Sequence, residues 1–123
     1  FRHSDVLNID WSSESGVIAT EGWLGENFMQ KPNQKQIDEN AQKVFDLWKK
    51  IFRKLEDSQI RRMAFCLPAW NYGRDKISIS EKVLTISKDL GYEPQEVFDG
   101  QTTTYYERDG ANVAREICVV ERN

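Results

Sequence analysis

Residues 17–25 read VIATEGWLG, and this stretch decides the fold that the rest of the chain follows. Residues 17–20 are apolar and partly β-branched, follow Gly16 and are too few for a helix, so they predict a short buried strand. Gly22 and Gly25 permit backbone angles and close approaches that a side chain would block, and so predict a tight loop. In open α/β sheets, ligands bind at the carboxyl ends of strands, where this loop would lie.

Two side chains make the loop a candidate site. The carboxylate of Glu21 beside the indole of Trp23 suits a planar, hydrogen-bond-donating group such as a nucleobase, because the ring can stack and the acid can accept an N–H. An ordinary strand-to-helix turn with a half-buried tryptophan could carry the same residues, so both interpretations stay open.

The composition describes an ordinary globular protein and narrows the possible functions. The 123 residues fit one domain, with 39% apolar and 30% charged residues. A net charge of −3 gives no overall basic field, so any contact with nucleic acid must be local. No apolar run approaches the length of a membrane span, and the first residues do not resemble a signal peptide, so we expect a cytoplasmic protein without membrane contact.

Two cysteines and one histidine limit the chemistry that the chain can carry. Cys66 and Cys118 lie in apolar, strand-like runs without CxxC spacing and with only His3 as a nitrogen ligand, so no metal site is predicted. Two reduced, buried thiols are the main expectation, and a disulfide is the alternative.

The clearest predicted element is a helix over residues 34–55, which begins after Pro32 and Asn33. Its apolar residues recur at steps of three and four and form one stripe that would pack on a sheet: Ile37, Ala41, Val44, Phe45, Trp48, Ile51, Phe52 and Leu55. A second buried strand over residues 62–68 ends at Pro68, and residues 69–76 form an aromatic loop that contains Trp70.

The last third of the chain predicts a helix and a hairpin. Ser78 and Glu81 form the pattern of a capping box for a helix that ends near Leu90. Residues 102–108 and 113–121 are rich in β-formers and are joined by an Asp-Gly dipeptide, which predicts a hairpin. We expect Arg115 to form a cross-strand ion pair within this hairpin.

The order strand, helix, strand, helix, antiparallel hairpin resembles the C-terminal half of a class I S-adenosylmethionine-dependent methyltransferase. Residues 18–25 resemble the acid-x-aromatic loop of the tRNA guanine-N2 methyltransferase-like branch, whose usual loop is D/N-P-P-Y/F with a TEPYLG-like variant. Residues 106–108 and 113–117 resemble that branch's closing hairpin, Y-x-R followed by V-x-R-E-I, and residues 65–70 its F-x-x-P-x-W/F strand end.

The resemblance implies an α/β fold with a partial Rossmann-like methyltransferase sheet, and makes residues 1–123 the C-terminal part of a methyltransferase domain. It implies methyl transfer from S-adenosylmethionine to an exocyclic amino group of a nucleobase, with tRNA as the expected substrate. Positioning would supply most of the rate, and no strong base would be needed.

The same resemblance assigns roles to individual residues. Asp5 would lie near the cofactor's adenine, and Thr20 would belong to the cofactor site. Glu21 would accept hydrogen bonds from the target amino group, and Trp23 would stack on the flipped base. The residues expected to border the substrate are Gly22, Gly25 and Trp70.

Two departures from the family pattern leave other functions open. Both prolines of the usual loop are missing, and the seven glycines form no GxG cofactor loop, so we expect the N-terminal cofactor-binding half to lie outside this chain and the chain alone to be inactive. One alternative is a catalytically inactive, methyltransferase-like interaction module, and another is a DNA adenine or cytosine methyltransferase. Without that half, the strand over 17–20 would be an exposed apolar edge, which predicts a homodimer or pairing with a separate N-terminal piece.

Overall fold

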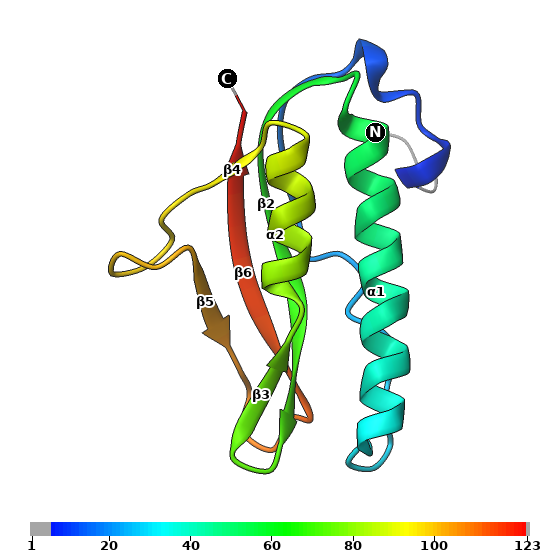
Figure 1. The fold of residues 1–123 in the computed structure, drawn as a ribbon, viewed down its shortest axis with the longest axis vertical. Helices are drawn as coiled ribbons and strands as arrows, with labels where there is room; N and C mark the ends of the chain where they lie inside the picture. The colour runs from blue at the N-terminus through cyan, green and yellow to red at the C-terminus, as the bar shows by residue number, and fades with distance from the viewer. Residues whose placement is uncertain (1–5, 123) are drawn as a thin grey trace.

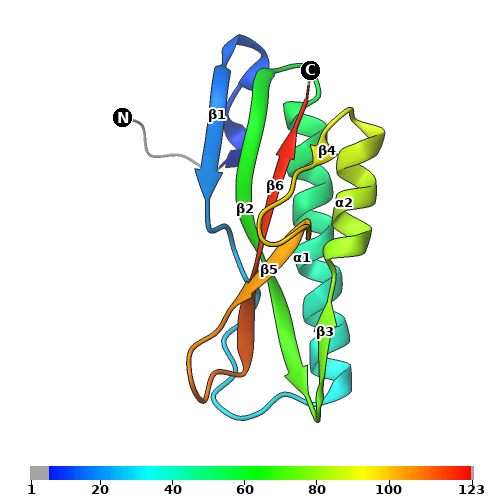
Figure 2. The same ribbon diagram turned by 90° about the vertical axis from the view of Figure 1, so that its left-hand side faces the viewer.

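The structure is a computed structural model that describes residues 6–122. The elements in chain order are η1 (Val6–Asn8), η2 (Trp11–Ser13), β1 (Ser15–Thr20), α1 (Gln34–Leu55), β2 (Gln59–Tyr72), β3 (Asp75–Ser78), α2 (Ser80–Asp89), β4 (Glu93–Pro94), β5 (Thr103–Tyr106) and β6 (Val113–Glu121). Within the described residues, six strands form one mixed sheet with α1 and α2 on one face (Figures 1 and 2). β1 pairs in parallel with β2, and β6 pairs antiparallel with β2, β4 and β5.

The helix α1 begins and ends at the predicted residues. The side chain of Asn33 accepts the N–H of Gln36, and the side chain of Gln36 accepts the N–H of Asn33, so both ends of a capping box are formed. The predicted stripe packs on the sheet, where the rings of Trp48 and Phe65 lie 4.6 Å apart between centroids. Local spacing and local capping therefore define this helix.

The mixed α/β class is confirmed, and the elements follow the predicted order with β3 and β4 in addition. The hairpin of β5 and β6 is confirmed, and Gly110 in its connection has φ +77°. The predicted capping box of α2 is not formed: the hydroxyl of Ser78 instead accepts the N–H of Ser80, and Ile79 is the N-cap residue.

The expectation of a buried strand at residues 17–20 is wrong. β1 pairs with one described strand, β2, and neither α1 nor α2 covers the outer face of the sheet (Figure 2). The side chain of Ile18 packs against the core, whereas Val17 on the opposite face is 69% exposed. β1 is therefore an edge strand, which confirms the expectation of an exposed edge at residues 17–20.

The expectations of a strand end at Pro68 and of a loop over residues 69–76 are also wrong. β2 continues to Tyr72, turns at Gly73 and pairs with β3. On the edge of β2 away from β6, the pairing with β1 ends at Phe65 and the pairing with β3 starts four residues later. Pro68 lies in this unpaired interval, where a residue without an N–H is tolerated.

Both cysteines are free thiols, so the alternative of a disulfide is wrong. Cys118 is buried among the core residues under the helices, whereas Cys66 is half-buried. Neither helix within residues 6–122 combines the length and the apolar character that crossing a membrane requires.

Candidate functional site

The loop that follows β1 lies against α1 because two of its residues are glycines. The hydroxyl of Thr20 accepts the N–H of Gly22 at 3.2 Å, and Gly22 and Gly25 have φ +76° and +97°. A Cβ on Gly22 would lie 2.8 Å from Cζ2 of Trp48, and one on Gly25 would lie 2.7 Å from Nδ2 of Asn40. The prediction of a tight, glycine-dependent loop is confirmed.

A buried amide anchors the far part of the loop. Oδ1 of Asn40 accepts the N–H of Glu26 at 3.0 Å, and Asn40 is almost fully buried in α1. Because a buried amide without a partner is costly, this bond fixes where the loop meets the helix.

The carboxylate of Glu21 is held by a residue from the other end of the chain. Nε of Arg115, on β6, donates to Oε1 of Glu21 at 2.5 Å. β2 lies between β1 and β6, and Arg115 faces Pro68 across the ladder, so the arginine side chain spans β2 to reach the loop. Among the described residues no hydrogen bond occupies Oε2 of Glu21, which leaves this oxygen as an acceptor.

The expected ion pair of Arg115 within its hairpin is wrong. Its neighbour Glu116 points to the opposite face of β6, where its buried carboxylate accepts a hydrogen bond from the hydroxyl of Ser78. Alternation along the strand separates the two charges and directs Arg115 to the face that Glu21 approaches.

Trp23 follows Glu21 and borders an apolar cavity. The indole is 41% exposed and lines a cavity of about 460 Å³ between β1, α1 and the two short helices. Thr20, Trp11 and Trp48 also line it, and none of the described residues that line it is charged. Nε1 of Trp48 is buried without a hydrogen-bond partner among the described residues. The cavity therefore suits flat, apolar groups.

Cys66 lies near the ion pair, and its surroundings disfavour the thiolate form. Burial raises the pKa of the Cys66 thiol, the charge of Glu21 raises it further, and the charge of Arg115 lowers it. The thiol is protonated near neutral pH, which does not favour covalent catalysis at this site.

The structure brings together five of the seven residues that the sequence singled out: Thr20, Glu21, Gly22, Trp23 and Gly25. Asp5 lies outside the described residues. Trp70 is 1% exposed within the core of β2 and offers no surface to a substrate in this structure. Sequence reasoning missed the contact of Arg115 with Glu21, although Arg115 belongs to the hairpin motif.

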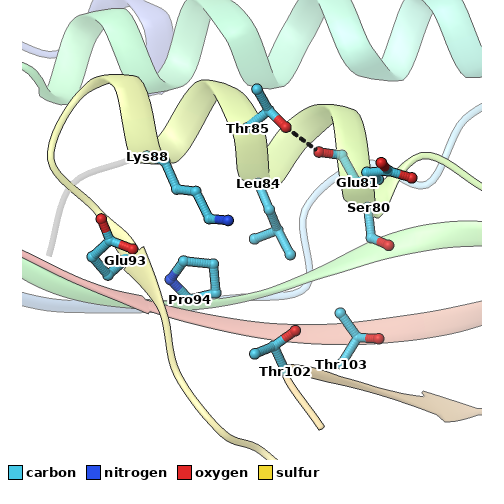
Figure 3. Close-up of a pocket in the computed structure, with 9 residues that line it drawn as sticks. All are labelled: Ser80, Glu81, Leu84, Thr85, Lys88, Glu93, Pro94, Thr102 and Thr103. Carbon is cyan, nitrogen blue, oxygen red and sulfur yellow. Dashed lines mark hydrogen bonds between the residues drawn. The ribbon is translucent and has the colours of Figure 1, made fainter.

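A second cavity, of about 520 Å³, lies between α2 and the strands β4 and β5 (Figure 3). Lys88 extends from α2 towards Pro94, and hydroxyl groups of Ser80, Thr102 and Thr103 border the space (Figure 3). No polar side chain that lines it is buried, and none belongs to the loop after β1, so the candidate site is the loop after β1.

Comparison with solved structures finds a similar fold in TTHA0409 of Thermus thermophilus, which is described as a putative DNA modification methylase. A selenomethionine derivative matches with a TM-score of 0.53 at 8% identity, and a second structure with 0.51 at 12%. A third, complexed with S-adenosyl-L-methionine, matches with 0.50 at 9% identity. The shared architecture is a methyltransferase fold.

Each match covers 95% of this chain and 49% of the other chain, so this chain spans about half the length of that protein. At these identities the likeness concerns the fold alone. No family model matches the chain, and a search of curated proteins finds no match.

Proposed function

We propose that this chain is the acceptor-binding half of an S-adenosylmethionine-dependent N-methyltransferase of the tRNA guanine-N2 methyltransferase-like branch, which acts in the cytoplasm on an exocyclic amino group of a nucleobase in tRNA. One observation carries the proposal. Glu21 follows directly on the carboxyl end of β1 with one oxygen that no described residue occupies, in the same loop as the partly exposed ring of Trp23.

The roles of the two side chains follow from their chemistry. Oε2 of Glu21 accepts a hydrogen bond from the amino group of the base and orients the nitrogen lone pair. The ring of Trp23 stacks on the base, a contact worth about 1–3 kcal/mol.

The described residues fit S-adenosylmethionine only in part. The cofactor supplies the methyl group on a sulfonium when it is bound. The cavity beside Thr20 accepts apolar and flat groups, but none of the described residues that line it is charged, so these residues offer no partner to the ionic amino acid portion of the cofactor. A complete cofactor site therefore requires residues beyond those described.

The proposal is tested by methyl transfer from labelled S-adenosylmethionine with the full-length gene product that contains this chain. We expect transfer to tRNA and not to DNA, and calorimetric binding of the cofactor by the full-length protein but not by residues 1–123. Glu21→Ala should reduce the rate constant about 10²-fold. Trp23→Ala should raise the KM for tRNA about 10-fold through lost stacking.

Two matched variants control for general damage. Glu121→Ala removes a comparably exposed carboxylate, which pairs with Arg62 at 2.8 Å, and Phe98→Ala removes an exposed ring outside the site. Both should keep the activity. Transfer to DNA alone would favour a DNA methyltransferase. If neither the full-length protein nor residues 1–123 binds the cofactor, the proposal of an enzyme is refuted.

A second candidate function is an interaction module without catalysis, favoured by the exposed edge of β1. Residues 15–20 contain no charge and no proline, and Val17 is largely exposed, so apart from a register irregularity between Gly16 and Val17 little on this edge prevents pairing. In that case two copies would associate through β1. Sedimentation velocity should then show a dimer that Val17→Lys dissociates and Phe98→Lys does not, and a monomer at micromolar concentration would exclude it.

A further inference from the structure

Arg115 joins the last described strand of the chain to the candidate site. Its partner Glu21 lies 94 residues earlier, and the two meet because β1, β2 and β6 are consecutive in the sheet. Both side chains remain partly exposed, at 31% for Arg115 and 51% for Glu21. The contact is therefore accessible to a substrate that approaches the loop.

The other ion pairs of the sheet differ from this one in what they connect. Arg62 pairs with Glu121 directly across the ladder of β2 and β6, and these two strands are already joined by backbone hydrogen bonds. Lys76 pairs with Glu107, which follows β5, and so joins two elements at the hairpin end. The pair of Arg115 and Glu21 instead fixes a side chain in the loop that follows β1, which is the candidate site.

A carboxylate on a long side chain loses orientation when nothing holds it. Glutamate has several rotatable bonds, and ordering them costs conformational entropy. An ion pair that orders the side chain before the substrate binds removes this cost from the binding step. The hydrogen bond from Nε of Arg115 holds Oε1 of Glu21 in place and so limits the positions that the other oxygen can take. Arg115 consequently restricts where Oε2 of Glu21 can lie.

We propose that Arg115 is a positioning residue for the methyl transfer, which orients Glu21 towards the amino group of the base and requires an acid at position 21. This inference rests on the proposed function. A glutamine at position 21 could still accept a hydrogen bond from the base, but it would lose the charge-assisted bond to the guanidinium. The geometry therefore predicts that Glu21 and Arg115 act as one unit.

The kinetic test uses the full-length protein with tRNA and labelled S-adenosylmethionine. Arg115→Gln should lower kcat about 10-fold or more with little change in KM, because it misdirects the acceptor without removing the stacking ring. Arg115→Lys should recover part of the loss. The double variant Glu21→Gln/Arg115→Gln should be no slower than Glu21→Gln alone, since Arg115 acts through Glu21.

Arg62→Gln is the matched control, because it breaks another partly exposed arginine–glutamate pair of the same sheet, outside the loop after β1. It should leave kcat unchanged. If Arg115→Gln behaves like Arg62→Gln, or if its effect multiplies with that of Glu21→Gln, the positioning role is wrong while the proposed function stands. If the wild-type protein transfers no methyl group, the proposed function fails and the positioning role fails with it.

A second readout needs no activity. In residues 1–123, the Nε–H resonance of Arg115 should be observed by NMR in slow exchange with water and should shift on Glu21→Gln. The Nε–H of Arg62 should not respond to that substitution. An Arg115 resonance that is indifferent to residue 21 would refute the contact on which the inference depends.

Discussion

Replacing Gly22 by alanine separates backbone strain from a steric clash at the candidate site. Gly22 and Gly110 have almost the same φ, +76° and +77°, but a Cβ would meet the ring of Trp48 at 2.8 Å in the first case and nothing within 4 Å in the second. The left-handed conformation costs an alanine roughly 1–2 kcal/mol at either position. Crowding a packed ring adds about 1–3 kcal/mol, and Trp48 has little room to move because it is buried against Phe65.

We therefore expect Gly22→Ala to lower the free energy of unfolding by about 2–5 kcal/mol and Gly110→Ala by about 1–2 kcal/mol. Urea denaturation of the two variants, followed by tryptophan fluorescence and by circular dichroism, measures the difference. The melting temperature should fall by about 4 °C for each kcal/mol lost. Equal losses in the two variants would show that Trp48 yields to the added methyl group and would refute the close packing inferred for the loop.

Two further predictions concern the surroundings of the loop. Glu21→Gln should lower the pKa of Cys66 and so speed its alkylation at pH 8, because a negative charge is removed while Arg115 remains. Arg115→Gln should raise this pKa and slow the alkylation. Alkylation rates that change in the same direction in both variants would contradict this prediction. Asn40→Ala should cost about 1–3 kcal/mol in urea denaturation, because it leaves a loop amide without its acceptor. Gln42→Ala, on the exposed side of the same helix, should change the stability little, and a similar loss in both variants would argue against the anchor.

Sequence reasoning succeeded where the determining interactions are local. The bounds of α1 followed from the 3.6-residue spacing of its apolar side chains and from Asn33, whose capping partner Gln36 is three residues away. The hairpin of β5 and β6 followed from the Asp-Gly dipeptide between its strands. In both cases the residues that decide the structure are neighbours in the chain.

Sequence reasoning failed where the answer depends on distant segments. Whether β1 is buried depends on what lies beside it, and the apolar run alone does not report this. A proline normally ends a strand, but β2 continues through Pro68. At this residue, the edge of β2 away from β6 pairs with neither β1 nor β3. The loop residues of the candidate site were found because they are contiguous, whereas Arg115 reaches Glu21 only through the strand order.

The strand order also bears on how the protein is made. Of the described strands, β6 is the last to leave the ribosome. It pairs with β2 on one side and with β4 and β5 on the other, and so joins β4 and β5 to the rest of the sheet. Until residues 113–121 are synthesised, β2 exposes an apolar edge that has no described partner on that side. Nascent chains that stall before this point should depend on chaperones, and a premature stop within β6 should give an aggregating product instead of a shortened fold.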